Sequence, residues 1–184
     1  MKARWLITTG LLAAAVTLAG AQERTVMVGG ESMLPSKNII ANAMQSKAHT
    51  TLVAAVKAAG LVDTLEGPGP FTVFAPTNQA FDALPDGTVQ SLLRPANKGA
   101  LTKVLTYHVV AGRLDSAALW QMVREGGGTA TLTTVEGGTL KVMANGPRNL
   151  VIEDAQGHVS EISTYDVYQS NGVIHVVTRV LMPK

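Results

Sequence analysis

The side chains best suited to chemistry in this chain are its histidines, because the sequence contains no cysteine. The four histidines are His49, His108, His158 and His175. They show no short pairing of the kind found at histidine-rich zinc sites, and thiolate metal sites are excluded. The acidic pair Glu153-Asp154 falls in an expected turn, where two acids more often form a solvated turn than a calcium loop. We therefore expect no metal and no cofactor.

Enzyme chemistry would need a motif that the sequence lacks. There is no Gly-x-Ser-x-Gly and no glycine-rich phosphate loop ahead of a helix. The triplet Gly126-Gly127-Gly128 instead precedes a Thr-rich run that is typical of a strand. Without a nucleophile beside a recognisable base, we expect no catalytic residues and a protein that is not an enzyme.

Two of the histidines fall in apolar patterns. His108 follows Leu101 and Leu105 on one face of an expected helix, so a buried, hydrogen-bonded role is favoured for it. The neighbouring Tyr107 could leave its hydroxyl at the surface. His175 lies in a nearly continuous apolar run. We hypothesise that His108 or His175 hydrogen-bonds to Thr77, to Asn78 or to the backbone near Pro76.

The first residues have the pattern of an export signal. Lys2 and Arg4 precede an apolar run over residues 6–18, and Ala19-Gly20-Ala21 offers the small residues of a cleavage site. We expect residues 1–21 to be removed, 22–36 to form a flexible lead-in, and the product to be secreted or periplasmic. The full chain has 15 Lys and Arg residues and 13 Asp and Glu residues, and removal of the signal takes away Lys2 and Arg4. The net charge of the remaining chain is therefore near zero, which argues against a nucleic acid partner.

Helical and strand patterns occur in succession along the rest of the chain. Helices are expected near 37–47, from Thr50 or Thr51 to Gly60, at 79–84 and 88–94, and after Asn97. Thr- and Val-rich runs predict hairpins at 129–135 with 139–143 and at 149–153 with 158–162, and the apolar run 173–181 predicts an interior strand. The pattern indicates one α+β domain over residues 37–184, with helices on a twisted antiparallel sheet or small sandwich.

Three separated segments resemble a known family. Residues 71–81 (FTVFAPTNQAF) resemble the first signature of fasciclin domains, residues 171–181 (NGVIHVVTRVL) resemble the second, and Tyr107-His108-Val109-Val110 resembles the tyrosine-histidine segment between them. The likeness spans roughly residues 37–183 and includes single-domain secreted bacterial members. Thr178 departs from the pattern, because many members carry Asp there.

The resemblance implies adhesion or another extracellular contact, with an unknown cell-surface or matrix protein or polymer as partner. It links Tyr107 and His108 to partner binding and makes Thr77, Asn78 and His175 signature residues of the fold. Trp120, beside mobile glycines, is a further candidate contact. We expect no direct membrane insertion after cleavage of the signal.

A second function remains open from the residues themselves. A carrier could enclose an apolar small molecule between helices and sheet, using the Met and Leu side chains of residues 33–53 or 119–143. Such a carrier requires a pocket of several hundred Å³, on the order of typical ligand sites. An enzyme is the third and least favoured alternative.

Overall fold

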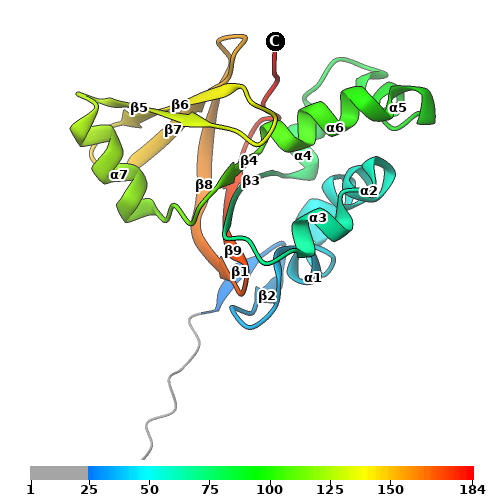
Figure 1. Ribbon diagram of the computed structural model, residues 1–184, viewed down its shortest axis with the longest axis horizontal. Coiled ribbons are helices and arrows are strands. Elements are labelled where there is room, and N and C mark those ends of the chain that lie inside the picture. Colours follow the sequence, from blue (N-terminus) through cyan, green and yellow to red (C-terminus); the bar gives the residue numbers. More distant parts are fainter. Residues whose placement is uncertain (1–24) are drawn as a thin grey trace, which may run out of the picture.

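The computed structural model describes residues 25–184 (Figure 1). Its helices are α1 (Ile39–Ala43), α2 (Thr50–Ala59), α3 (Val62–Glu66), α4 (Asn78–Asp82), α5 (Thr88–Leu92), α6 (Lys98–Tyr107) and α7 (Ser116–Glu125), with short 3-10 helices η1 (Lys47–His49) and η2 (Pro95–Asn97). Its strands are β1 (Val26–Val28), β2 (Glu31–Met33), β3 (Phe71–Pro76), β4 (Val109–Ala111), β5 (Thr129–Thr133), β6 (Thr139–Asn145), β7 (Asn149–Glu153), β8 (Val159–Gln169) and β9 (Gly172–Val177).

Seven of these strands form one sheet in the order β4-β3-β9-β8-β7-β6-β5. The expected α+β class, with helices packed on a twisted sheet, is confirmed. The sheet is mixed rather than wholly antiparallel, because β3 and β9 run parallel from Phe71 opposite Gly172 to Pro76 opposite Val177, while the other neighbouring strands pair antiparallel. An isolated bridge between Val110 and Thr134 brings the two edge strands together, so the sheet is nearly closed. The strongly curved strands are visible in Figure 1.

The sheet separates two apolar clusters. Ile174 and Val176 of β9 pack with the helical cluster, to which α1, α2, α3 and α6 contribute, while Val177 packs with the cluster that α7 covers. Every residue of β9 is buried. The alternation of side chains along a strand explains why both faces are apolar, as we expected for an interior strand. The strand is shorter than expected and ends at Val177 rather than at residue 181.

The helix ends depend on caps that differ in part from those expected. Asn38, rather than Ser36, caps α1 by accepting a hydrogen bond from the Ala41 amide at 2.7 Å, and this helix ends at Ala43 instead of continuing to residue 47. Thr77 caps α4 through the Ala80 amide. The Asn97 side chain donates to the Ser91 carbonyl and makes no capping bond to α6.

A hairpin made by β1 and β2 occupies much of the segment that we expected to be a flexible lead-in. Val28 and Met33 are buried in the helical cluster, so this segment is attached to the domain. Gly29 has a φ of +62° at the turn, and a Cβ there would lie 2.6 Å from the Ala48 nitrogen. Only glycine fits this close approach. Across residues 25–184, no helix has the length and apolar character needed to cross a bilayer.

Candidate functional site

Tyr107 ends α6 with its side chain completely buried. Its hydroxyl donates to the Thr139 carbonyl at 2.6 Å and accepts from the Ala155 amide at 2.9 Å. Burial raises the pKa of the phenol, so the hydroxyl keeps its proton. Tyr107 therefore links the start of β6 to the turn between β7 and β8. The direct partner contact expected for Tyr107 does not fit this burial.

His108 is also buried and uses both ring nitrogens. Nδ1 lies 2.8 Å from the Val104 carbonyl and Nε2 accepts from the Leu181 amide at 2.9 Å, which places the proton on Nδ1. Burial lowers the pKa of His108 to about 4, so the ring is neutral at pH 7. A direct partner contact does not fit His108 either, because it ties α6 to the C-terminal segment.

His175 holds a different set of elements together. Its Nε2 lies 2.8 Å from the Leu114 carbonyl and its Nδ1 accepts from the Asp166 amide at 3.4 Å. Burial lowers the pKa of His175, and the ring stacks on Phe74 with centroids 5.8 Å apart. Neither His175 nor His108 makes the hydrogen bond that we predicted to Thr77, Asn78 or the backbone near Pro76, since their nitrogens meet other backbone groups.

Asn78 links the first signature segment to the helical layer instead. Its side-chain oxygen accepts from the Thr51 amide at 3.1 Å, and its side-chain nitrogen donates to the Lys47 carbonyl at 2.9 Å. These two bonds fix the start of α4 against η1 and the start of α2.

The structure also brings Ser116, Asp166 and His175 together, a set that sequence reasoning missed. The Ser116 hydroxyl donates to the Asp166 carboxylate, and the Asp166 amide donates to His175. Asp166 is the only residue other than glycine with positive φ, at 56°, among those described. Because both nitrogens of His175 are engaged by backbone groups, the imidazole has no free nitrogen with which to deprotonate Ser116.

Trp120 lies on α7, half-buried against the cluster that α7 covers. Tyr107 and His108 are buried, so the structure does not bring these three side chains to one exposed surface. No group of three potential metal ligands occurs within residues 25–184.

Above Tyr107 lies an open surface depression of about 710 Å³, here called the Tyr107 hollow. Its charged lining residues are Lys103, Glu136, Lys141, Glu153, Asp154 and Lys184. Lys141 pairs with Glu153 at 2.9 Å, and Lys103 lies 3.7 Å from Glu136. The two segments that Tyr107 connects, at Thr139 and Ala155, both contribute to this lining, so the buried tyrosine holds together two parts of the wall.

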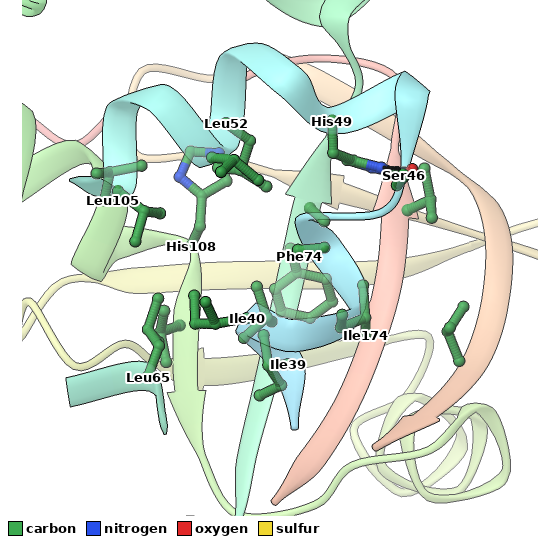
Figure 2. Close-up of a pocket in the computed structure, with 18 of the residues that line it drawn as sticks. Ile39, Ile40, Ser46, His49, Leu52, Leu65, Phe74, Leu105, His108 and Ile174 are labelled. Atoms are coloured by element: carbon green, nitrogen blue, oxygen red, sulfur yellow. Dashed lines mark hydrogen bonds between the residues drawn. The ribbon is translucent and has the colours of Figure 1, made fainter. Parts of the chain in front are cut away.

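A second, apolar space lies between the helical layer and the sheet (Figure 2). This helix–sheet cavity measures about 50 Å³, and isoleucine, leucine and valine dominate its walls. It is far smaller than the several hundred Å³ that a carrier of a drug-sized apolar molecule requires. His49 and Ser46 are among its few polar lining residues, and sequence reasoning gave neither of them a role.

Known proteins resemble this chain along most of its length. Protein sll1483 of Synechocystis is 40% identical over 163 residues, which cover 88% of this chain and 82% of that protein. Immunogenic protein MPB70 of Mycobacterium bovis is 36% identical over 139 residues, 73% of this chain and 63% of its own length. Transforming growth factor-beta-induced protein ig-h3 of Sus scrofa is 38% identical over 132 residues, which are only 17% of that protein.

The fold matches the FAS1 domain pair of the insect cell adhesion molecule Fasciclin I with a TM-score of 0.72. The match covers 81% of this chain and 52% of that one at 17% sequence identity, and it concerns the fold alone. The profile of the Fasciclin domain matches residues 47–183, which include both signature segments and the tyrosine-histidine segment. The chain therefore belongs to the fasciclin family.

Proposed function

We propose that this protein is an exported adhesion or extracellular interaction module that binds a cell-surface or matrix protein or polymer. Membership of the fasciclin family supports an extracellular adhesion-type role in general. The observation that carries the specific proposal is the Tyr107 hollow, which presents both signs of charge on a broad open surface. The lysines of the hollow are about half exposed beside carboxylates that are less exposed, and this charged lining favours a partner with a complementary charge pattern over an apolar ligand.

The buried histidines support an interaction role over catalysis. His108 and His175 each place both ring nitrogens on backbone groups, and burial keeps both rings neutral at pH 7. Their contacts join the C-terminal segment and β9 to the rest of the fold. The tyrosine-histidine segment then acts on a partner indirectly, because Tyr107 positions the turns that carry Glu136 and the residues around Asp154.

Export rests on the leader over residues 1–21, which lies outside the described residues. Mass spectrometry of the protein purified from its host tests this part of the proposal. The expected N-terminus is Gln22, and an intact Met1 in the mature protein would contradict export by cleavage after Ala21.

Charge reversal tests the hollow as a binding surface. Lys141→Glu removes the ion pair with Glu153 and changes the local charge, yet an exposed pair is worth at most about 1 kcal/mol, so the fold survives. We expect the variant to lose at least tenfold in affinity for a partner that the mature wild-type chain captures from cell-envelope extract. The matched control is Lys47→Glu, which breaks a similar pair with Glu31 outside the hollow.

The outcome has two informative parts. If binding survives Lys141→Glu but is lost with Lys47→Glu, the contact surface lies near the β1–β2 hairpin. That result would overturn the role of the hollow. Turnover of a substrate that one substitution at His108 or His175 abolishes, with stability intact, overturns the interaction role itself.

A further inference from the structure

A further surface depression, here called the Arg179 groove, lies between the α4–α5 segment and the residues that follow β9. Its volume is about 380 Å³. Ala83, Leu84 and Pro85 line it from one side, and Val180 and Met182 line it from the other. Val180 belongs to the helical cluster, and Leu84 and Met182 pack against that cluster, so the core holds these apolar walls in place.

Arg179 places a positive charge at this groove. Its side chain lines the groove, is exposed, and forms no ion pair within residues 25–184. Of the described residues that line the groove, none is acidic; Asp82 and Asp86 lie in the α4–α5 segment but outside the lining. The other lining residue that can carry a positive charge is His158, whose Nδ1 already lies 3.3 Å from the buried Asp154 carboxylate. Arg179 is therefore the cation that an anionic ligand would meet in the groove.

Apolar walls beside one guanidinium fit a molecule that has a carboxylate at one end and an apolar body. A guanidinium pairs with a carboxylate through two parallel N–H···O bonds, and an aliphatic body removes the apolar walls from water. An inorganic anion would pair with Arg179 but leave the walls in contact with water. A neutral apolar molecule would cover the walls but leave the charge without a counterion. The combination of the two features favours an aliphatic carboxylate.

The volume of the groove limits the size of this molecule. A cavity of about 150 Å³ holds benzene, which corresponds to roughly 25 Å³ for each carbon atom. At that density an acid of about ten non-hydrogen atoms occupies roughly 250 Å³, which is less than the volume of about 380 Å³ that the groove offers. This volume also falls within the range of about 300–1,000 Å³ that is typical of small-molecule sites. We propose that the Arg179 groove binds a small aliphatic monocarboxylate, with its carboxylate on Arg179 and its chain against Leu84, Val180 and Met182.

This proposal does not depend on partner binding at the Tyr107 hollow and is tested with octanoate as the probe, below the concentration at which octanoate forms micelles. We expect octanoate to shift the NMR signals of the Met182 methyl group and of Arg179 Nε saturably. Octanamide has the same chain without the charge and is expected to bind about three- to fivefold more weakly, the effect of one exposed ion pair. Hexanoate lacks two methylene groups and is expected to bind about fourfold more weakly, because each half-buried methylene strengthens binding about twofold.

Three variants of the protein complete the test. Arg179→Gln removes the charge from an exposed side chain, so the fold survives, and this variant is expected to bind octanoate and octanamide equally. The matched control is Arg148→Gln, which changes an exposed arginine outside the groove and is expected to keep the wild-type preference for octanoate. Ala83→Trp fills the groove from an exposed position and is expected to abolish the binding of both probes. A preference for octanoate that persists in Arg179→Gln, shifts that do not saturate, or undiminished octanoate binding in Ala83→Trp would each overturn the proposal.

Discussion

The burial of His108 makes the stability of the fold depend on pH. Burial lowers its pKa to about 4 in the folded chain, whereas an exposed histidine in the unfolded chain has a pKa of about 6.5. The Val104 carbonyl and the Asp154 carboxylate favour the charged ring but do not compensate for burial. Between these two values the unfolded chain binds more protons than the folded chain. The contribution of His108 to the free energy of unfolding is therefore fully present above pH 6.5. This contribution is lost progressively as the pH drops toward 4.

The size of this effect follows from the two pKa values. Integrating the difference in proton binding from pH 7.5 to 5.0 gives a loss of about 2 kcal/mol from His108 alone. For a urea m-value of about 2 kcal/mol/M, the midpoint of urea unfolding drops by about 1 M. His49 and His175 also have lowered pKa values and act in the same direction.

Urea unfolding at several pH values isolates the contribution of His108. His108→Gln does not titrate in this range and provides an oxygen that can accept from the Leu181 amide. We expect its midpoint to fall by about 1 M less than that of the wild type between pH 7.5 and 5.0. Ring ¹⁵N shifts give an independent reading, with His108 neutral in the folded wild type at pH 5.5. An equal pH dependence in both proteins, or a protonated His108 ring at pH 5.5, would refute the reasoning.

Three further substitutions and one control, Tyr168→Phe, test the hydrogen bonds that connect separate elements, each by urea unfolding. Tyr107→Phe leaves two backbone groups unpaired and should lower stability by about 2 kcal/mol, whereas Tyr168→Phe, which loses one 3.3 Å bond, should cost less than 1 kcal/mol. His175→Phe should cost about 2 kcal/mol, and an unchanged midpoint would contradict its linking role. Asn171→Asp faces two carbonyls with a carboxylate and should cost more than 3 kcal/mol; a smaller loss contradicts the assigned contacts.

Local patterns predicted most of the strands correctly. The alternating residues of β5, β6 and β7 and the start of β8 lie where the hairpin signals placed them, because hairpin pairing depends on nearby residues and turn chemistry. The parallel pairing of β3 with β9 escaped prediction, since it joins segments about a hundred residues apart and depends on how the whole chain packs. The first helix was predicted too long because Met44 extends the apolar spacing of Ile39 and Ile40, whereas in the structure Met44 is exposed and α1 ends at Ala43.

The site was predictable only in part. The helical spacing of His108 with Leu101 and Leu105 correctly indicated burial, but its partner at Leu181 depends on a distant segment. His49 stands after a polar, lysine-containing stretch, and nothing local indicates that its ring turns into a cavity. Asn171 begins the second signature segment, yet its bonds to the Ile39 amide and the Leu65 carbonyl come from tertiary packing.

The position of β9 has a consequence for the order in which the chain acquires its fold. This strand lies between β3 and β8 in the sheet, yet it follows both of them in the sequence and is the last strand of residues 25–184. During synthesis, β3 and β8 have no central partner until β9 has been made. Long-range pairings of this kind form late and slowly, so an unfinished chain cannot complete the sheet. The central position of β9 therefore makes closure of the sheet a late step in folding.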